Sequence, residues 1–404
     1  MKILFLTDNF PPETNAPATR TWEHARRWCA SGHQVTVITC APNFPTGRVF
    51  AGYRNRLYTV ERMDGIRVIR VWTYMSRNSG FWKRALDFFS FCISASFWGL
   101  FQRFDVCVAT SPQFFTAVAG WIVGTIRRKP WVFELRDLWP ESITTVGAMR
   151  PGLAIRTIER FELFLYRQSA AVVAVTNSLK GNLETRGVTS GKIFVVPNGA
   201  NLDLYRPQNA DSSVREKLRR AGRPIVGYLG TLGMAHALGL VVRVAKRRPG
   251  IEFVLIGDGA ERAKLQRLRE RLGAENVTML PPVAKEQVPT YLAAFDYALV
   301  NLRRSETFKT AIPSKIFEAA AMRKPILLGV EGEACDILRR YEAGIPFRPE
   351  DEDSFCAALD RAFAGDSNGE YERMQDGCER LAQAYDRSIL AKEMITILIK
   401  VGFG

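Results

Sequence analysis

Thirteen short runs of apolar and β-branched residues alternate with longer stretches of helical periodicity along almost the whole chain of 404 residues. The runs in the first half span residues 2–8, 34–39, 66–72, 105–111, 131–137, 171–176 and 192–198, and those in the second half span residues 225–231, 252–259, 277–281, 297–302, 325–329 and 344–347. A strand followed by a helix, repeated many times, is typical of a parallel sheet with helices on both faces. The alternation therefore predicts an α/β fold, and thirteen strands are too many for one sheet of this kind.

We expect two Rossmann-like domains. Turn residues and the charged stretch VREKLRRAGRP separate the two groups of strands near residues 198–222, which predicts a first domain at residues 1–200 and a second at 201–387. The C-terminal helix, within residues 388–404, is able to pack on either domain and to return to the first. Because open α/β sheets bind ligands outside the carboxyl ends of their strands, two such sheets facing each other predict a binding cleft.

The positive charge of the chain is concentrated in its first half. Residues 1–200 contain 25 Lys and Arg against 13 Asp and Glu, a net charge of +12, whereas residues 201–404 contain 31 against 28, a net charge of +3. Such asymmetry indicates contact with a polyanion or an anionic membrane, since a basic residue near a lipid surface contributes about 1 kcal/mol. A basic face that is merely solvated is the alternative.

One segment interrupts the alternation. Residues 86–101, LDFFSFCISASFWGLF, contain five phenylalanines and a tryptophan between basic flanks. They are too few to span a bilayer, which takes about 20 apolar residues, so an interfacial helix and a buried core helix are both open. The basic first half favours the membrane, with Phe88, Phe89, Phe91, Phe97 and Trp98 as the contacts.

Cysteine and histidine usage excludes several classes of site. The seven cysteines form no CxxC pair and their number is odd, so we expect a reducing compartment without a disulfide framework. The three histidines are not spaced as ligands, and we expect no metal or other cofactor. Asp8 and two prolines interrupt the N-terminal apolar run, so we interpret that run as a first strand and not as a signal peptide.

Several turns after strands are candidates for holding phosphate. Gly230 and Gly233 lie in a turn that is expected to open a helix, and further tight turns occur at PNG (197–199) and GDGAE (257–261). Backbone amides at such a helix start can cradle a pyrophosphate, although ordinary turn chemistry is the better explanation of each turn taken alone. The Pro-rich loop DNFPPETNAPATR leads to a helix expected at residues 19–30 and lacks GxGxxG, so a dinucleotide fingerprint is absent.

The stretch RRSETFKTAIPSKIFEA (303–319) combines basic residues with a carboxylate at a helix start. Ser314 is a good N-cap, and Glu318 on the first turns is favourable to the helix dipole by about 0.3 to 1 kcal/mol without any ligand. Lys309 and Lys315 could balance a departing diphosphate, because charge-assisted hydrogen bonds contribute about 1.5 to 3 kcal/mol each. Glu318 would repel phosphate but could accept two sugar hydroxyls, which indicates the ribose of a nucleotide sugar.

In the first half, FELRDLWPES (133–142) places four charged residues at the carboxyl end of a strand: Glu134, Arg136, Asp137 and Glu141. Charged residues that end a buried strand are expected to line the ligand cleft more often than to serve structure alone.

The order of these motifs resembles the retaining GT-B glycosyltransferases of family 4. The resemblance covers essentially the whole chain and rests on PPE with a following Arg20, SGHQVTVIT, RDLWPES, VVPNGANLDLYRP, GTLG, IGDG and PSKIFEAAAMRKPIL. Within the family it is strongest to the branch of L-fucosamine and N-acetylhexosamine transferases of bacterial O-antigen and capsule synthesis. It implies that the second domain holds the donor, usually a UDP-sugar, and that the first contacts the acceptor.

The resemblance also implies roles for individual residues. Glu318 matches the second Glu of the family's E-x7-E signature, which binds the donor ribose, while the first Glu is replaced by Thr310. The usual Arg and Lys of the phosphate loop are replaced by Thr231 and His236, so Lys309 and Lys315 are the expected substitutes. A His-Asp pair of the family's first domain appears as Arg136 and Asp137.

The expected site has three groups of residues. Those expected at the reacting centre are Lys309, Lys315, Asp137 and Arg136; those expected to bind the donor are Glu318, Ser314, Gly230, Thr231, Gly233, His236, Gly257 and Thr310; and those expected on the acceptor side are Asn15, Arg20 and Glu134.

The main functional hypothesis is an enzyme on the cytoplasmic face of the plasma membrane. It would move an N-acetylhexosamine or deoxy-aminosugar from a UDP-sugar to a polyprenyl-pyrophosphate-linked saccharide, at an anionic membrane surface. A nucleotide-sugar epimerase of the same fold and a non-catalytic basic binding protein are the alternatives. Nucleic acid is not an expected partner, because the aromatic residues do not interleave with Lys and Arg as a stacking groove requires.

Overall fold

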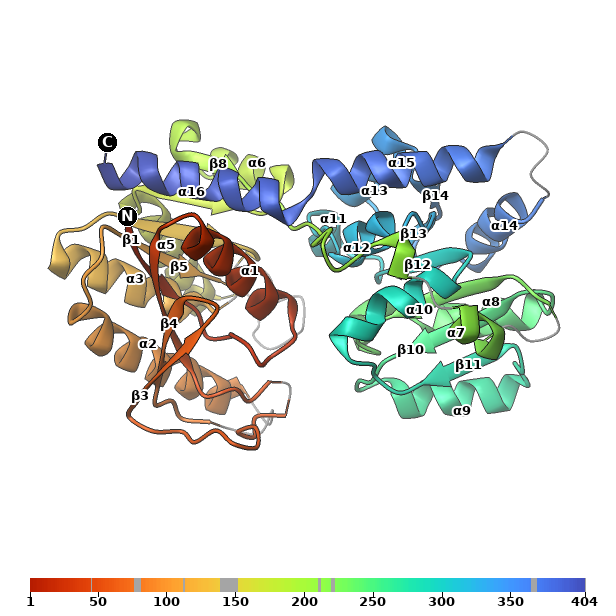
Figure 1. The fold of residues 1–404 in the computed structure, drawn as a ribbon, viewed down its shortest axis with the longest axis horizontal. Helices are drawn as coiled ribbons and strands as arrows, with labels where there is room; N and C mark the ends of the chain where they lie inside the picture. Colours follow the sequence, from red (N-terminus) through yellow and green to blue (C-terminus); the bar gives the residue numbers. More distant parts are fainter. Residues whose placement is uncertain are drawn as a thin grey trace. The chain divides into compact units, whose positions relative to one another are not determined.

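The chain forms two compact units, each built around one sheet (Figure 1). A computed structural model describes residues 1–44, 46–75, 81–111, 113–138, 152–209, 212–218, 222–364 and 369–403. The first unit comprises Met1–Pro197 and Ser388–Gly404, and the second comprises Asn198–Arg387. The division predicted from the sequence had its boundary after residue 200.

The sheet of the first unit has eight strands in the order β3-β4-β2-β1-β5-β6-β7-β8. The strands are β1 (Lys2–Leu6), β2 (Gln34–Cys40), β3 (Tyr58–Met63), β4 (Ile66–Val71), β5 (Val106–Thr110), β6 (Trp131–Leu135), β7 (Ala171–Ala174) and β8 (Ile193–Val195). All neighbours are parallel except β3 and β4. The strand order reverses between β1 and β5.

Helices cover both faces of this sheet. They are α1 (Ala16–Ala30), α2 (Phe81–Leu100), α3 (Phe114–Arg127), α5 (Leu153–Gln168), α6 (Asn177–Thr185) and α16 (Arg387–Phe403). Because side chains alternate along a strand, Leu4 and Leu6 of β1 pack with α2, α3, α5 and α6, while Ile3 and Phe5 pack with α1 and α16. The second face of the sheet is therefore covered in part by α16, a helix from the far end of the sequence.

The sheet of the second unit has six strands in the order β11-β10-β9-β12-β13-β14, all parallel. They are β9 (Ile225–Leu229), β10 (Glu252–Ile256), β11 (Val277–Leu280), β12 (Tyr297–Asn301), β13 (Ile326–Gly329) and β14 (Gly344–Pro346). Its helices are α7 (Ser212–Leu218), α8 (Gly239–Arg247), α9 (Arg262–Leu272), α10 (Val288–Ala294), α11 (Glu306–Lys309), α12 (Lys315–Ala321), α13 (Glu333–Tyr341), α14 (Glu352–Ala362) and α15 (Glu370–Ala384). Here the strand order reverses between β9 and β12.

The second sheet is also covered on both faces. Helices α8, α9 and α14 pack on one face around Phe253, and α10, α12, α13 and α15 pack on the other around Val254. The predicted α/β class with two parallel-sheet, Rossmann-like domains is therefore confirmed.

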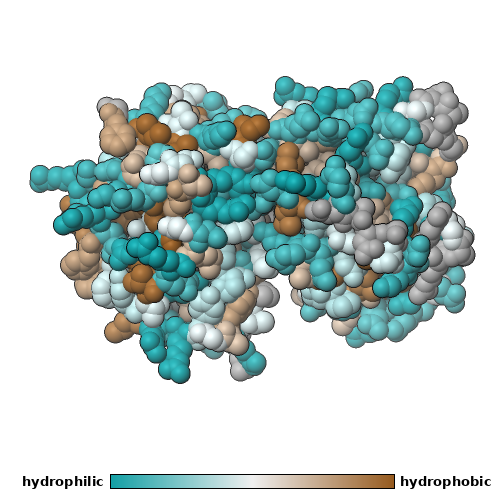
Figure 2. Space-filling model, in the orientation of Figure 1, coloured by the Kyte–Doolittle hydropathy of each residue, from teal (hydrophilic) through white to brown (hydrophobic). Residues whose placement is uncertain are grey.

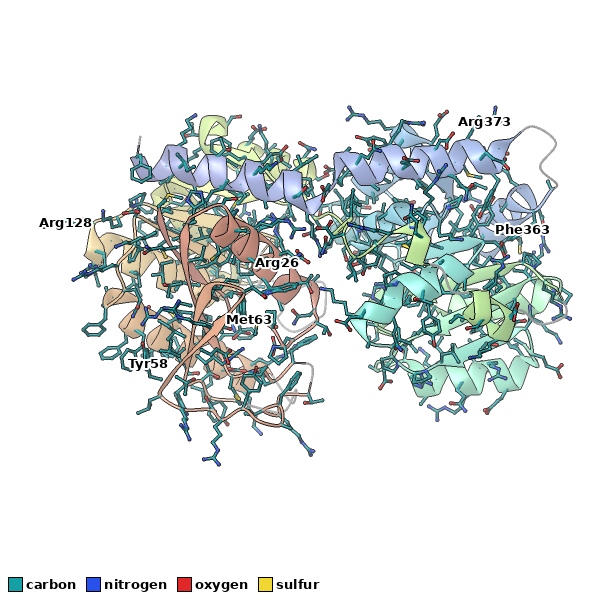
Figure 3. The ribbon with its side chains drawn as sticks, in the orientation of Figure 1. Arg26, Tyr58, Met63, Arg128, Phe363 and Arg373 are labelled. Carbon is teal, nitrogen blue, oxygen red and sulfur yellow. The ribbon has the colours of Figure 1, made fainter. Side chains whose placement is uncertain are left out.

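The strand β3 was missed from the sequence. It is the antiparallel edge strand of the first sheet, its residues YTVERM are partly or fully exposed, and its ends are marked by Tyr58 and Met63 in Figure 3. This strand carries no continuous apolar run, which is the signal that found the other thirteen. The turn Asp64-Gly65 that joins β3 to β4 is a hairpin signal that could have shown it.

Two helix starts also differ from expectation. Helix α1 begins at Ala16 and not at residue 19, because Asn15 is its N-cap and accepts a hydrogen bond from the Ala18 amide at 2.9 Å. Ser314 was predicted to cap α12, but its backbone is already helical (φ −59°, ψ −24°) and its side chain makes no capping hydrogen bond. Instead the Ile316 amide bonds to the Pro313 carbonyl at 3.1 Å, so a tight turn starts the helix.

Candidate functional site

Two glycine turns interlock at the carboxyl edge of the second sheet, where the parallel strands end. The turn Gly230–Gly233 follows β9, and the turn Gly257–Gly259 follows β10. The Gly230 amide donates to the Ile256 carbonyl at 2.9 Å, and the Leu232 amide to the Asp258 carbonyl at 2.8 Å. These two amides are therefore not free to cradle a phosphate. Thr231 and Gly233 make no such backbone bond within the described chain, and their amides are the ones left for a ligand.

Glycine is required at two of these positions. At Gly257 (φ +143°) an added Cβ would lie 1.9 Å from the Gly230 carbonyl oxygen. At Gly230 (φ +145°) it would lie 2.3 Å from Cε of Lys315. Only a residue without a side chain permits both contacts and both backbone conformations. The first turn is thus shaped to admit Lys315.

Lys315 begins α12 and reaches across to the end of β9. Its ammonium lies over the Tyr228 ring, 5.3 Å from the centroid, and its stem packs on Gly230. Burial lowers the pKa of Lys315, and the nearby Glu318 opposes that shift. The structure thus places a cation beside the predicted phosphate turn.

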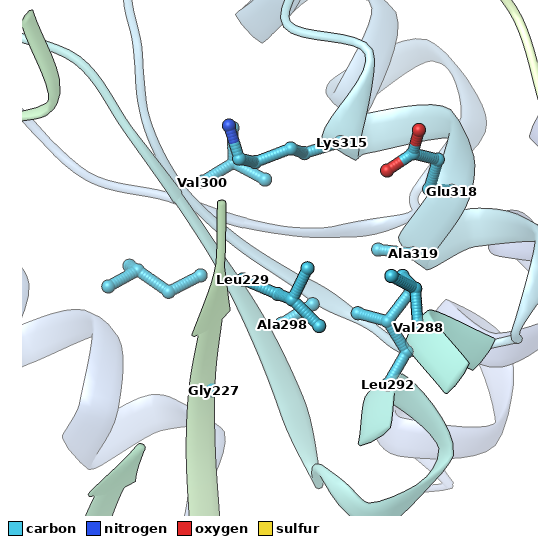
Figure 4. A pocket seen from close by; sticks show the side chains of 10 residues that line it. Gly227, Leu229, Val288, Leu292, Ala298, Val300, Lys315, Glu318 and Ala319 are labelled. Atoms are coloured by element: carbon cyan, nitrogen blue, oxygen red, sulfur yellow. The ribbon is translucent and has the colours of Figure 1, made fainter. Parts of the chain in front are cut away.

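Glu318 lies one turn further along α12, and its side chain remains partly accessible. Burial raises the pKa of its carboxyl group, while Arg387, Lys315 and Lys285 lower it, as does a hydrogen bond with Tyr205. Figure 4 shows Lys315 and Glu318 projecting from the same helix beyond the end of the β9 strand. The two also line a small pocket whose other residues are apolar side chains and glycine: Gly227, Leu229, Val288, Leu292, Ala298, Leu299, Val300 and Ala319.

His236 follows the same turn and cannot supply a second cation. Its Nδ1 lies 3.3 Å from the Asn301 carbonyl, and the Asn301 side chain donates to the His236 carbonyl at 2.9 Å. Burial, reinforced by the charge of Lys315, lowers the pKa of His236 to about 4. The imidazole is therefore neutral at pH 7 and adds no positive charge to that of Lys315.

Lys309 does not join Lys315. Its ammonium pairs with Glu306 at 2.6 Å and lies 4.0 Å from Glu331, and the residue ends a partly exposed helix of one turn, α11. Thr310, where the resemblance places a missing Glu, bonds to the Thr307 carbonyl at 2.9 Å. The predicted lysine pair is thus not assembled, because acidic neighbours hold Lys309 at the surface.

At the carboxyl edge of the first sheet, Arg20 and Glu134 form a buried ion pair. The Arg20 guanidinium donates to Glu134 at 2.8 Å and to the carbonyls of Val196 and Pro197 at 2.8 Å and 2.6 Å. Arg20 is 3% exposed and Glu134 is fully buried. Their bonds join α1, β6 and the end of β8, which gives the pair a structural role, while the expected acceptor contact stays a prediction.

Arg136 and Asp137 follow β6, and their amides donate to the Ser111 hydroxyl at 2.8 Å and 3.5 Å. Burial raises the pKa of Asp137, and Arg136 opposes the shift. Asn15 is held by its capping role and donates to the Asn9 side chain at 2.6 Å. Glu141 lies outside the residues that the structure describes.

Three carboxylates at the same edge were not singled out in the sequence: Asp8, Glu13 and Asp87. Asp8 follows β1, Glu13 lies in the β1–α1 loop, and Asp87 lies on α2. The only sequence signal for Asp8 is that an acidic residue follows the first strand closely. The strand order reverses beside this strand, but that reversal is a property of the fold and cannot be seen in a local sequence pattern.

Helix α2, which contains most of residues 86–101, has one face buried in the core and another that is exposed and apolar. Phe91 is fully buried in the core, so its expected membrane contact is wrong. Trp98 packs against the Tyr58 ring with centroids 4.3 Å apart, and Phe88 is partly buried. The opposite face carries a stripe of exposed apolar residues at helical spacing, 48% exposed or more in every case: Leu86, Phe89, Ile93, Phe97 and, just after the helix, Phe101.

Neither a membrane span nor a metal site is found where the chain is described. None of the helices in these ranges combines the length and the hydrophobicity needed to cross a bilayer. The same residues contain no group of three or more His, Cys, Asp or Glu side chains placed to hold a metal ion.

Two family matches and several similar proteins show the family and the fold of this chain. Residues 15–199 match the glycosyl transferase 4-like domain, and residues 210–377 match glycosyl transferases group 1. WcaI of Escherichia coli (strain K12), assigned to colanic acid biosynthesis as a glycosyl transferase, is 23% identical over 90% of this chain and 92% of its own length. A D-inositol 3-phosphate glycosyltransferase of Nocardia farcinica is 32% identical over 61% of this chain and 56% of its own length.

The same architecture occurs in solved structures. Sucrose-phosphate synthase from Thermosynechococcus elongatus superimposes with a TM-score of 0.75 at 17% identity, over 99% of this chain and 98% of the other. HepE of Anabaena, solved in complex with UDP and glucose, gives a TM-score of 0.72 at 18% identity, over 98% of this chain and 99% of the other. With both halves matched to glycosyl transferase families and the fold shared along its whole length, the chain is a GT-B glycosyltransferase of family 4.

Proposed function

We propose that the enzyme transfers a sugar, with retention, from a UDP-sugar to a lipid-linked saccharide during the synthesis of a bacterial surface polysaccharide. The observation that carries the donor half is the arrangement of Lys315 and Glu318 at the end of β9. A cation beside two unused amides suits a diphosphate, and a partly accessible carboxylate one turn away suits the hydroxyls of a ribose.

The relatives support the polysaccharide setting. WcaI is assigned to colanic acid biosynthesis, and TuaH of Bacillus subtilis, 20% identical over 65% of this chain, is assigned to teichuronic acid biosynthesis. HepE was solved with UDP and glucose, which supports a UDP-sugar as one donor that this architecture accepts. We propose an N-acetylhexosamine or a deoxy-aminosugar as the sugar, as the resemblance to the corresponding branch implies, and a polyprenyl-pyrophosphate-linked saccharide as the acceptor.

Turnover of the donor tests this proposal. The full chain is incubated with UDP-N-acetylglucosamine, UDP-N-acetylgalactosamine or UDP-glucose and a lipid-linked acceptor extract, and UDP release is measured. GDP-mannose serves as the comparison, since a relative from Mycolicibacterium smegmatis is named as dependent on it. Release of UDP only when acceptor is present supports the proposal. Turnover of GDP-mannose alone would reject the UDP assignment, and conversion of the UDP-sugar without an acceptor would indicate the epimerase.

Glu318→Ala tests the ribose contact by binding alone. We expect UDP affinity to fall about tenfold, the effect of losing hydrogen bonds to a charged group, while the melting temperature is unchanged or higher because an acid with a raised pKa is removed. Unchanged affinity would show that Glu318 only serves the helix.

We also propose that the first unit binds the cytoplasmic face of the plasma membrane through α2. The exposed stripe of α2 offers apolar side chains to the lipid, and Lys83, Arg84 and Arg103 are exposed beside it. The polar and apolar residues on the face drawn in Figure 2 are interspersed, as on an ordinary soluble surface. Exposed apolar residues do not form a continuous layer over that face.

Vesicle flotation tests this surface. Binding to vesicles of phosphatidylcholine with phosphatidylglycerol is expected, and Phe89→Asp with Ile93→Asp should abolish it. The matched control is Ile389→Asp with Ile399→Asp on α16, two apolar residues that are 44% and 41% exposed in the same unit. Equal loss in both double variants would reject α2 as the binding surface.

A further inference from the structure

A cleft of about 510 Å³ opens beside the edge strand β3 of the first sheet. Its walls come from β3, from Arg70 near the end of β4, and from Tyr53, Arg54 and Arg56 in the loop that joins β2 to β3. Because β3 is the outermost strand of this sheet (Figure 1), the cleft lies at the lateral edge of the first unit. Its volume is within the range of ligand sites in proteins.

The floor of the cleft is neutral, because the one acid among the described residues that line it is already paired. Arg70 is 4% exposed, and its guanidinium donates to Glu61 at 2.8 Å and to the carbonyls of Cys40 and Pro11 at 3.0 Å and 2.5 Å. The Tyr53 ring lies 4.8 Å from this guanidinium. Arg70 therefore joins β4 to β2, to β3 and to the β1–α1 loop, and its charge is balanced by Glu61.

Arg54 and Arg56 carry the net positive charge of the cleft. Both are exposed, and neither forms an ion pair or a side-chain hydrogen bond with any residue that the structure describes. Asn55 between them fixes the loop, since its side chain donates to the Thr73 carbonyl at 2.7 Å and accepts from the Thr73 amide at 3.2 Å. The Arg56 amide bonds to the Arg54 carbonyl at 3.1 Å in a tight turn. The loop is thus held in place without either guanidinium, and both are left to bind a ligand.

Two guanidinium groups on one cleft select an oxyanion that carries more than one charge. A guanidinium is a planar fork that binds a carboxylate or a phosphate through two hydrogen bonds. A carboxylate has two oxygens and one charge, which a single guanidinium matches. A phosphate group has three free oxygens and up to two charges, so it can accept from both arginines at once. Because the loop is already fixed, little conformational entropy is lost on binding.

We propose that Arg54 and Arg56 form a binding site for a phosphate or diphosphate group. The site belongs to the first unit, whereas the donor turns belong to the second, and its binding of phosphate does not rest on the proposed sugar transfer. Two sources share this chemistry: a soluble phosphate compound and the headgroup of an anionic phospholipid. The headgroup would suit the position of β3, because Tyr58 at its start packs on Trp98 of α2 with ring centroids 4.3 Å apart. That source rests on the proposed membrane binding.

Isothermal titration calorimetry of the full chain with inorganic pyrophosphate, at low ionic strength and without a sugar donor, tests the soluble source. Lys315 is expected to bind a diphosphate as well, so the titrations are made with Lys315→Met as the parent protein. We expect saturable binding to this parent and about 10- to 100-fold weaker binding after Arg54→Met and Arg56→Met are added, the loss that hydrogen bonds from charged groups account for. Tighter binding of succinate than of pyrophosphate would overturn the choice of phosphate.

The matched control is Arg62→Met. Arg62 is an exposed arginine of the same strand that lies outside the walls of the cleft and has no ion pair among the described residues, so its loss should change pyrophosphate affinity less than threefold. An equal loss in Arg62→Met and in the double variant would show that general surface charge, and not this cleft, attracts the anion.

Flotation with vesicles of phosphatidylcholine and phosphatidylglycerol distinguishes the two sources. Weaker flotation of Arg54→Met with Arg56→Met, with Arg62→Met unchanged, assigns the site to a lipid headgroup. Unchanged flotation together with weaker pyrophosphate binding assigns it to a soluble phosphate compound. A double variant that equals its parent in both measurements would overturn the site, even if UDP-sugar turnover were found. Absence of that turnover with intact pyrophosphate binding would reject only the proposed function.

Discussion

The two sheets share one architecture, but the points at which their strand orders reverse carry opposite chemistry. In the second sheet, the end of β9 receives the ammonium of Lys315, and cations surround Glu318. In the first sheet, the end of β1 carries Asp8 among further carboxylates. The first half of the sequence nevertheless holds the larger positive charge, +12 against +3. Net charge therefore describes the surface of each unit and not its site.

The largest expected effect tests whether Arg20 and Glu134 belong to structure or to binding. Glu134→Ala should lower the free energy of unfolding by about 3 to 5 kcal/mol, because it leaves the buried Arg20 without its carboxylate. Denaturant unfolding measures this, with Glu184→Ala at the surface as control, where about 0 to 1 kcal/mol is expected. If the Glu134→Ala protein were as stable as the wild type and had lost only acceptor binding, Arg20 and Glu134 would have the acceptor-binding role expected from the sequence.

Lys315, which lies where the strand order of the second sheet reverses, should contribute more to donor affinity than Lys309. Lys315→Met is expected to weaken UDP binding by about 10- to 100-fold, since a charge-assisted hydrogen bond contributes about 1.5 to 3 kcal/mol. Lys309→Met should change it less than threefold, because Lys309 already pairs with Glu306. Isothermal titration calorimetry with UDP separates them. Similar losses in both variants would contradict the structural separation of the two lysines.

Gly230 tests the shape of the same turn. Gly230→Ala places a methyl group 2.3 Å from Cε of Lys315 in a backbone conformation with φ +145°, and should cost about 1 to 3 kcal/mol of stability. Gly250→Ala in the same unit meets nothing within 4 Å and has no positive φ, so its unfolding free energy should stay close to that of the wild type. Equal denaturation curves for the two variants would show that the turn can move aside.

A pH dependence of the unfolding free energy, which builds up gradually over several pH units, tests Asp8. Burial, with Asp87 and Glu13, raises the pKa of Asp8 to about 8 in the folded chain. The folded chain thus keeps a proton that the unfolded chain has lost above about pH 4. Stability from this group is present below pH 4 and falls as the pH rises to about 8, by at most about 1.4 kcal/mol per pH unit.

Denaturant unfolding at pH 5, 6.5 and 8 measures this slope. Asp8→Asn should flatten it and make the protein more stable than the wild type at pH 8, while Asp64→Asn, at an exposed carboxylate of the same unit, should keep the wild-type slope. If Asp8→Asn and the wild type had the same slope, Asp8 would not have a raised pKa in the folded chain.

The sequence predicted the buried strands well, because a strand covered on both faces has to be apolar at successive positions. The edge strand β3 has one exposed face and escaped that criterion. The same limit applies to Phe91 and Phe97, which look alike in the sequence. They lie on opposite faces of α2, so that the first is buried and the second is 53% exposed.

Local pattern was also a poor guide to partners. Lys309 and Lys315 are six residues apart and looked like one cluster, yet Glu306 and Glu331 hold the first while a glycine turn admits the second. Arg20 and Glu134 were expected on the acceptor side, and nothing in the sequence indicated that these two residues, 114 positions apart, form an ion pair with each other. Such pairings depend on which strands become neighbours.

The sequence by itself determined the class of the fold, the two sheets, the position of Glu318 on a helix start and the family, since these follow from periodicity and from the order of motifs. The tertiary structure alone decided which charges stand together: Lys315 with Gly230 and Tyr228 at one reversal of strand order, and Asp8 with Glu13 and Asp87 at the other. The physical reason is that a sheet edge gathers residues from strands distant in the chain, and burial there sets their charges in ways that no local pattern contains.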